Sequence, residues 1–495
     1  MRVVVVGAGL GGLSAACHLA GRGHDVTVVE REGGPGGRAG RWESAGYAID
    51  TGPSVLTMRD LLADTFAAAG ADLADHLRLS AVDPMYRAWF PDAGPISVRR
   101  GREAMTEEIR ATCGPADAAA FGRFADWLGR LYRVEQPDFI ARNYDRSADL
   151  ARPLLPALRL ARLGAFRRMA TVVDGYFADP RLRQLFSFQA LYAGLSPFDA
   201  LAIYCVITYM DTVEGVWFPE GGVHAVARGL AEAAAEAGAD LRYDAPVARI
   251  VRRLGSSGSV TGVRLADDTF LPADAVVANP DLPAVYRELI PSARMPRAAR
   301  RGTYSPSCTL WLAGVRGRLP EGAGHHNIHF GSDWKGSFDA LLRAGTRQPD
   351  PAILVSAPTV TDPTLAPAGG HVLYALEPVP NLDGRIDWAS DRARFRDTLV
   401  ERLARAGYPV GAADVVTERF VDPLDWEAQG MERGTPFALS HRFFQSGPWR
   451  PANRDRRVPG LVLVGSGTVP GVSVPMVLVS GRLAADRVDE LAAGR

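Results

Sequence analysis

The chain has 495 residues, 47% of them hydrophobic, and its 56 basic and 56 acidic residues leave a formal net charge of zero. This length exceeds one simple core, so we expect two interleaved domains, and the balanced charge predicts no nucleic-acid partner. The four cysteines, Cys17, Cys113, Cys205 and Cys308, are too scattered for a disulfide-reductase motif or a structural zinc site, so no metal site is predicted.

The first thirty residues follow the order of a βαβ nucleotide-binding unit. A strand over Val3–Val6 leads into a glycine-rich turn, and a helix over Leu13–Arg22 and a strand over Asp25–Val29 follow. In such a unit the glycines let the backbone approach a pyrophosphate, which the N-terminus of the helix faces. The residues expected to bind a dinucleotide here are Gly7, Ala8, Gly9, Leu10, Gly11 and Gly12.

An acidic residue ends the second strand. Glu30 lies eighteen residues after Gly12, where its carboxylate can accept hydrogen bonds from the ribose of an adenosine. An acid here argues against the 2′-phosphate of NADP, although its neighbour Arg31 is a cation. Gly37 and Arg38 follow. We expect Arg31, Gly37 and Arg38 to contact the cofactor, with Arg38 paired with the pyrophosphate.

Two further glycine-containing segments favour FAD over NAD, because a flavin cofactor extends far beyond the adenine. A tight turn begins at Gly52, and near the other end of the chain a buried strand over 460–464 runs into a glycine-rich loop with a helix from about Pro475. Such a late strand returns to the first sheet in two-dinucleotide-type flavoproteins. The residues expected at the flavin are Gly52, Pro53, Ser54, Gly465, Ser466, Val474, Pro475 and Met476.

Residues 115–215 are rich in Leu, Phe, Tyr and Arg, which predicts a mostly helical insertion. Several of its apolar residues would share one helical face surrounded by arginines, as in a helix that lies in a membrane interface. Arg162 interrupts this face, so a solvated helix packed on the core fits equally well. No run is long enough to span a bilayer. The residues of the predicted face are Leu155, Leu158, Phe166, Met169 and Val173.

The rest of the chain predicts an α/β protein with a discontinuous Rossmann-type FAD-binding domain and a second domain built on a mixed sheet. Strands over 309–315, 352–356 and 372–376, with a helix over 391–406, suit the mixed sheet. The predicted division is an FAD-binding domain of 1–80, 216–290 and 455–495, a substrate-binding domain of 81–114 and 291–454, and the helical insertion 115–215.

No nucleophile stands beside a base in any recognisable motif, so the flavin must carry the reaction. His325, Asp211 and Glu214 are weak catalytic candidates only. His325 belongs to a histidine pair without carboxylates at matching spacing, and both acids could instead cap a turn before Trp217. The catalytic residues are therefore not predicted from the sequence.

The chain resembles bacterial-type phytoene desaturases over almost its whole length. The flavin motifs in this resemblance are shared with amine oxidases and protoporphyrinogen oxidases, whereas the middle segments are typical of carotenoid desaturation. Residues 472–476 depart from the small, glycine-containing run expected there. The matching segments are GAGLGGL at 7–13, PGGR at 35–38, WFPEGG at 217–222, HHNI at 325–328, TDPTLAP at 361–367 and GTVPG at 467–471.

The resemblance implies an FAD-dependent carotenoid desaturase, with Val247 near the adenine, that introduces double bonds into a long apolar polyene by hydride transfer to the flavin. Conjugation stabilises the developing allylic cation, so we expect no indispensable protein base. The chain begins on its first strand, so a cytoplasmic protein is expected, peripherally associated with the inner face of the cell membrane. The alternatives are a related amine- or porphyrinogen-oxidising flavoenzyme and a non-catalytic flavin-binding membrane-associated protein. No oligomeric state is predicted.

Overall fold

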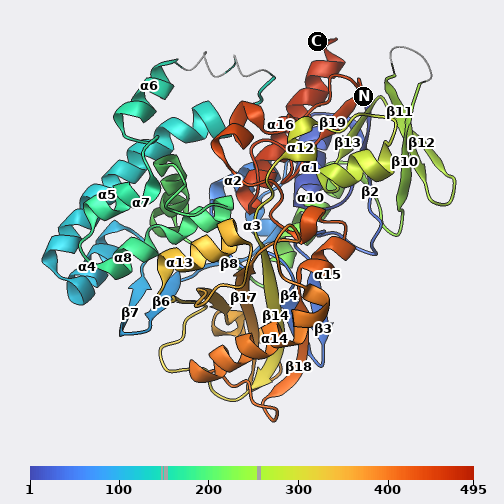
Figure 1. Ribbon diagram of the computed structural model, residues 1–495. Helices are drawn as coiled ribbons and strands as arrows, with labels where there is room; N and C mark the ends of the chain where they lie inside the picture. Colours follow the sequence, from blue (N-terminus) through green and yellow to red (C-terminus); the bar gives the residue numbers. More distant parts are fainter. Residues whose placement is uncertain (146–148, 150–153, 254–257, 495) are drawn as a thin grey trace.

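The computed structural model describes residues 1–145, 149, 154–253 and 258–494 (Figure 1). A five-stranded parallel sheet forms the nucleotide end, with the strand order β19-β13-β1-β2-β9. Counted along the chain, this is the 5-4-1-2-3 order of a dinucleotide-binding fold. The strands are β1 (Arg2–Val6), β2 (Asp25–Val29), β9 (Asp240–Arg242), β13 (Ala275–Ala278) and β19 (Leu461–Leu463).

Both faces of this sheet are covered, which explains why β1 consists almost entirely of valine. Val3 and Val5 pack toward the helices, whereas Val4 and Val6 pack toward a three-stranded antiparallel sheet. Strands buried on both faces are continuous apolar runs. The helices are α1 (Leu10–Gly21), α10 (His224–Glu236) and α16 (Val474–Ala492), and the small sheet contains β10 (Val247–Arg252), β11 (Val260–Leu265) and β12 (Phe270–Pro272).

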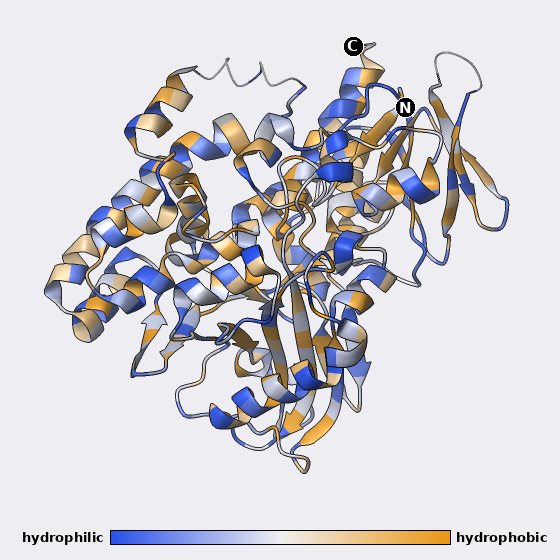
Figure 2. Ribbon diagram, viewed as in Figure 1, coloured by the Kyte–Doolittle hydropathy of each residue, from blue (hydrophilic) through white to orange (hydrophobic). Residues whose placement is uncertain are grey.

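A seven-stranded sheet lies below the nucleotide end (Figure 1) and confirms the predicted mixed sheet. Its pairs are antiparallel except for β6 with β15. One face packs on α14 (Trp388–Arg405), whose outer side is strongly polar in Figure 2. In sheet order the strands are β18 (Val415–Val421), β14 (Ser307–Arg316), β17 (Gly370–Val379), β16 (Ile353–Ser356), β15 (His326–His329), β6 (Tyr86–Phe90) and β7 (Ala93–Val98).

The predicted helical insertion is present and stands beside the seven-stranded sheet. Its core is aromatic: the buried ring of Phe124 contacts the rings of Trp127, Phe177 and Phe186. α4 (Arg102–Cys113) precedes the insertion. The elements of the insertion are α5 (Pro115–Glu135), η1 (Gln136–Ile140), α6 (Leu154–Arg162), α7 (Met169–Tyr176), α8 (Pro180–Leu185), η3 (Phe188–Ala193), η4 (Ala202–Cys205), α9 (Val206–Thr208) and η5 (Tyr209–Glu214).

The prediction that one helical face carries the apolar residues of 155–173 is wrong. The backbone turns at Gly164, which has a φ of +75°, and separates α6 from α7. Met169 and Val173 of α7 are fully buried in the core, whereas Leu155 and Leu158 of α6 stay exposed. Of the residues on the predicted face, only those of α7 are therefore buried in the core that the insertion forms with α5.

Shorter elements connect these layers. In the part of the chain that the structure describes, no helix is both long and apolar enough to cross a membrane. The connecting elements are β3 (Arg41–Ser44), β4 (Tyr47–Asp50), α2 (Arg59–Ala68), α3 (Leu73–His76), β5 (Leu79–Ala81), β8 (Trp217–Pro219), α11 (Leu282–Ala284), η6 (Val285–Leu289), α12 (Arg297–Arg301), α13 (Trp334–Asp339), η7 (Ala340–Ala344), η8 (Pro358–Val360), η9 (Pro363–Leu365), α15 (Pro423–Ala428), η10 (Glu432–Gly434), η11 (Phe443–Gln445) and η12 (Gly447–Trp449).

We expect Phe124→Ala to destabilise the protein, because it removes the ring at the centre of the aromatic core. A Phe-to-Ala change in a core costs about 3–5 kcal/mol of unfolding free energy. Urea denaturation followed by circular dichroism measures this loss. Phe270→Ala is the control because that ring is 41% exposed. An equal loss in both variants would contradict the central position of Phe124.

Candidate active site

The glycine-rich turn brings the start of α1 against the end of β1. A Cβ on Gly12 would lie 2.1 Å from the carbonyl oxygen of Gly7, so no side chain fits at residue 12. Gly7 has a φ of +97°, which favours glycine. The helix begins at Leu10, three residues earlier than predicted, because these glycines let its first turn lie within the motif. The N-terminus of α1 therefore borders the cavity described below.

Glu30 is buried and holds the same turn from the other side. Its Oε2 accepts a hydrogen bond from the backbone N–H of Ala8 at 2.7 Å, and its Oε1 accepts one from the N–H of Glu32 at 3.0 Å. The carboxylate also lines the cavity. It can therefore fix the turn and still accept a hydrogen bond from a bound ribose.

Arg38 also lines the cavity, but its guanidinium already has partners. Its Nη2 contacts Oδ2 of Asp281 at 2.5 Å, and its Nη1 donates to the carbonyl of Pro436 at 3.0 Å. Burial raises the pKa of Asp281, and the neighbouring Arg38 opposes that change. The predicted contact of Arg38 with a pyrophosphate stays a prediction.

Two loops lie at the end of the cavity where we expect the flavin, away from the glycine-rich turn. The hydroxyl of Tyr374 donates to the carbonyl of Gly52 at 2.8 Å and holds the turn 52–54. Arg450 is buried and donates to the carbonyls of Ser466 at 2.6 Å and Thr468 at 2.9 Å, which holds the loop before α16. Burial lowers the pKa of Arg450 to about 10. The backbone at both loops is thereby fixed from behind.

A continuous cavity of about 1160 Å³ joins these parts. Its lining includes all residues expected to bind the dinucleotide and flavin except Ala8 and Gly12. Those two lie behind the wall, where Ala8 donates to Glu30 and Gly12 contacts Gly7. The predicted residues thus come together, and their individual contacts with a cofactor stay predictions.

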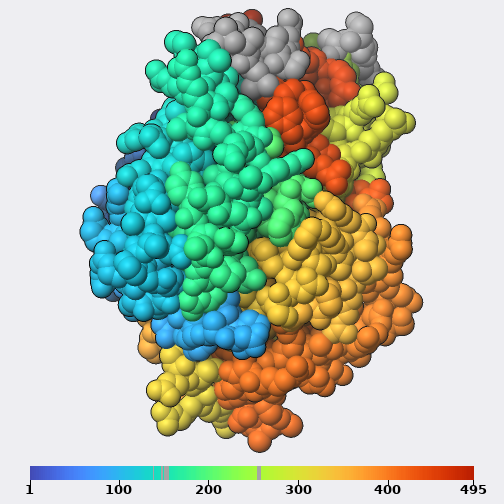
Figure 3. Space-filling model, turned by 60° about the vertical axis from the view of Figure 1, so that its left-hand side comes forward, coloured from blue at the N-terminus to red at the C-terminus, as the bar shows by residue number. Residues whose placement is uncertain are grey.

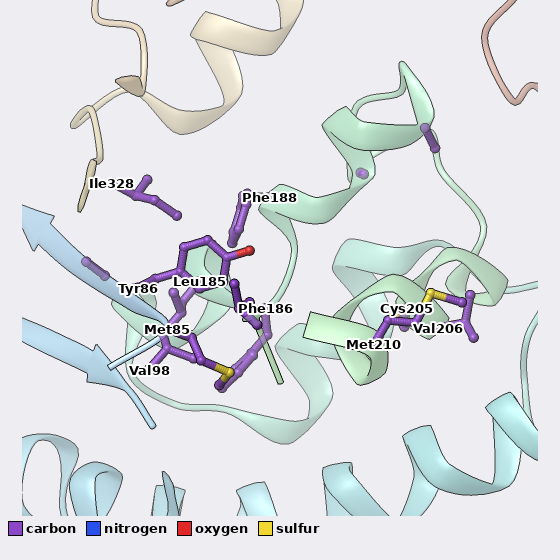
Figure 4. Packing of buried hydrophobic residues seen from close by; sticks show 14 of the residues in the cluster. Met85, Tyr86, Val98, Leu185, Phe186, Phe188, Cys205, Val206, Met210 and Ile328 are labelled. Carbon is purple, nitrogen blue, oxygen red and sulfur yellow. The ribbon is translucent and has the colours of Figure 1, made fainter. Parts of the chain in front are cut away.

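The cavity continues into an apolar arm between the seven-stranded sheet and the helical insertion. Its wall is formed by side chains from strands and helices far apart in sequence, several of which Figure 4 shows. Residues that line this arm include Tyr86, Phe188, Val206, Met210, Leu310, Ile328, Phe330, Trp334 and Leu341.

The three weak catalytic candidates have different positions. Asp211 lines the apolar arm, whereas His325 and Glu214 are not among the described residues of the cavity wall. His325 Nδ1 is 2.7 Å from Thr361 Oγ1, its ring packs on Phe218, and burial lowers its pKa to about 3. Its surroundings are those of a neutral structural histidine.

The apolar arm reaches the protein surface beside α6. Phe166 and Phe443 line the cavity and are also 45% exposed each. Phe443, Phe444 and Trp449 form a cluster of mutually contacting rings at this point. In Figure 3 the helical insertion, coloured green, abuts the yellow-orange segment that contains α13.

Sequence reasoning missed several residues of the site. Tyr86 and Tyr192 lie in separate elements that only the fold brings together, and no local motif marks them. Asn279, in contrast, directly follows the buried strand β13, and its Nδ2 donates to the carbonyl of Gly7 at 3.4 Å. A polar residue at the carboxyl end of a central parallel strand is a signal that could have found it.

Comparison with known proteins places this geometry in a family. The model of a family described as flavin-containing amine oxidoreductase matches residues 10–489. The chain belongs to this family. It is 48% identical to a phytoene dehydrogenase of Streptomyces griseus, over 98% of this chain and 94% of that protein. It is 38% identical to a zeta-carotene-forming phytoene desaturase of Myxococcus xanthus, over 98% and 93%.

Solved structures share the fold at low sequence identity. An oxidoreductase of Methanosarcina mazei superposes with a TM-score of 0.63 at 17% identity, covering 99% of this chain and all of that one. A double mutant of putrescine oxidase gives a TM-score of 0.60 at 16% identity, with coverages of 100% and 99%. These likenesses confirm the flavoprotein α/β fold with its mixed sheet.

FAD is the cofactor of this chain, and the cavity fits it. Gly9 and Gly11 line the cavity, and a Cβ on either residue would meet the side chain of Asn279. The helices α1 and α16 both begin at the cavity wall, where their N-terminal N–H groups favour an anion such as a pyrophosphate or an electron-rich flavin edge. Glu30 lines the same cavity, and its contact with the ribose stays a prediction.

We expect Gly9→Val to lose FAD, because a Cβ at residue 9 would already lie 2.7 Å from Nδ2 of Asn279. Overpacking of this kind costs about 1–3 kcal/mol of unfolding free energy, and the turn that shifts to relieve it no longer offers the same backbone to the cofactor. The flavin-to-protein absorbance ratio of the purified protein measures the loss. Gly34→Val is the matched control, since a Cβ there meets nothing within 4 Å. Full flavin content in Gly9→Val would contradict the assignment of this turn.

Proposed function

We propose that the chain is an FAD-dependent carotenoid desaturase that introduces double bonds into a phytoene-like polyene. The observation that carries this proposal is the single cavity that joins the dinucleotide-binding turn to a long apolar arm. Relatives named phytoene dehydrogenase and phytoene desaturase align over nearly the whole chain. A hydrocarbon matches the apolar side chains that line this arm.

The protein's task in this reaction is positioning. FAD, when bound, accepts the hydride equivalent that leaves one carbon of a CH–CH unit. The aromatic and aliphatic wall of the arm holds the polyene in one alignment and keeps water away from the reacting carbons. Flat aromatic surfaces come from different parts of the protein, at Phe188, Phe330 and Trp334. The polyene would therefore contact protein on several sides.

A related enzyme that oxidises amines is the first competing function. It would have to bind a cationic substrate next to the flavin, and such a substrate would lose its hydration in this apolar arm. A wall built from side chains such as Leu310, Ile328 and Leu341 supports a hydrocarbon substrate instead.

The predicted division of the chain remains our proposal. All strands of the parallel sheet fall within 1–80, 216–290 and 455–495, which supports a discontinuous FAD-binding domain. All strands of the seven-stranded sheet fall within 81–114 and 291–454, which supports the substrate-binding domain.

We further propose that the protein associates with the inner face of the cell membrane around the opening of the apolar arm. Leu155 is 69% exposed, and Leu158 and Phe166 are exposed beside it. The exposed arginines Arg162 and Arg167 flank them and would attract anionic lipids. A polyene could then pass from the bilayer into the arm without crossing water.

Expression in bacteria that accumulate phytoene tests the proposed reaction. We expect coloured products with longer conjugated systems, which chromatography with absorbance detection identifies. Cells that carry the flavin-depleted Gly9→Val variant are the control. Unchanged, colourless phytoene in cells with the flavin-loaded wild type would overturn the proposed function.

Flotation with anionic liposomes tests the membrane proposal. We expect the variant with Leu155, Leu158 and Phe166 all changed to Ser to bind more than about tenfold more weakly than the wild type, because burying each side chain contributes about 1.5–3 kcal/mol. The matched control changes three exposed apolar residues elsewhere, Val360, Val416 and Leu424, to Ser. Equal flotation of both variants would place the membrane-binding face elsewhere.

A further inference from the structure

An acidic residue lies in the mostly apolar wall of the arm. Asp211 belongs to the π-helix η5, is buried, and lines the cavity beside Met210. Its Oδ1 accepts a hydrogen bond from Oγ1 of Thr212 at 2.9 Å, and its Oδ2 accepts one from Nε2 of Gln189 at 3.4 Å. Burying a carboxylate in an apolar wall costs free energy unless hydrogen bonds or a partner charge compensate it, so its presence suggests a function.

Two phenols face this carboxylate from other elements. Tyr86 of β6 and Tyr192 of η3 line the cavity and interact electrostatically with Asp211, and burial raises the pKa of both phenols above the usual value. Figure 4 shows the ring of Tyr86 projecting toward Phe188, with its hydroxyl on the side of Met210. Because their pKa values are raised, both phenols are neutral at physiological pH and add no charge beside Asp211.

Glu135 is a second buried acid of the same cavity, and its surroundings are the opposite. Its Oε1 has no hydrogen-bond partner among the residues that the structure describes, and burial raises its pKa well above the usual value. Asp211 differs because two donors stabilise its charged form. Where environments separate two acids in this way, the one that ionises more readily is the candidate base.

In place of the sequence-based expectation that no protein base is indispensable, we propose that the carboxylate of Asp211 accepts the proton that desaturation removes from the polyene. This inference rests on the proposed desaturase function. One C–H bond gives up its hydrogen with both electrons, which oxidises the substrate and reduces FAD. The adjacent C–H bond breaks toward the new C=C bond, and its proton bonds to an oxygen of Asp211. The proton leaves to water when the product departs, and the carboxylate is restored.

The electrostatics of the site agree with this role. Burial raises the pKa of Asp211 to about 7, while the hydrogen bonds from Thr212 and Gln189 oppose that change. A base works best when its pKa lies near the operating pH. Asp211 must be ionised to accept a proton, so kcat/KM should fall about tenfold for each pH unit below its pKa.

The test compares the wild type with variants of Asp211. Each FAD-loaded enzyme is mixed with phytoene in liposomes without oxygen, and the rate of flavin reduction in a single turnover is monitored by flavin absorbance. We expect Asp211→Asn to slow flavin reduction by about 10²- to 10⁴-fold and to remove the acidic limb of the pH profile. Asp211→Glu should restore part of the rate and the pH limb. Flavin content and melting temperature confirm that each variant is folded.

Two controls decide between explanations. Glu214→Gln changes an acid of the same π-helix that is absent from the described cavity wall, so its rate and pH limb should match the wild type. The proposal is overturned if Asp211→Asn reduces its flavin within about tenfold of the wild-type rate and keeps the acidic limb of the pH profile. It is also overturned if that limb disappears in Glu135→Gln instead. A wild type that phytoene never reduces overturns the desaturase function itself.

Discussion

The carbonyl oxygen of Gly7 lies 2.1 Å from the position that a Cβ on residue 12 would occupy, so β1 and α1 meet backbone to backbone. This contact aims the N-terminus of α1 into the cavity and leaves Ala8 free to donate to Glu30. The N-terminus of α1, the carboxylate of Glu30 and the backbone of the turn thus line one cavity. Segments far away in the sequence, at Gly52 and Gly465, line the same cavity, which is where we expect the flavin.

The parts of the site that the sequence predicts are those with local, periodic causes. The valine run of β1, the glycines and Glu30 lie within one βαβ unit, where spacing alone sets the geometry. The late strand and the start of α16 were equally predictable, because a buried run followed by a glycine-rich loop has few other structures. Arg38 shows the limit even here, since its partner Asp281 comes from 243 residues away.

The residues of the apolar arm, where the substrate is expected, could not be predicted from local sequence in this way. Tyr86, Tyr192 and Asp211 meet only because β6, η3 and η5 pack together, and nothing local in their sequences encodes that meeting. The same reason explains the wrong helical face: Met169 and Val173 find apolar partners in the insertion's core, while Leu155 finds none. Periodicity identifies apolar faces, but the neighbours decide which of them is buried.

Apolar surroundings have two consequences at once in this molecule. A wall that excludes water suits a hydrocarbon, and the same exclusion raises the pKa of any acid that lines it. Burial raises the pKa of Glu135 well above its usual value, and its Oε1 has no hydrogen-bond partner among the described residues, whereas the hydrogen bonds from Thr212 and Gln189 oppose the rise at Asp211. A base of useful strength therefore needs no separate machinery here. It follows from placing one carboxylate, with two weak donors, in the surface that already binds the polyene.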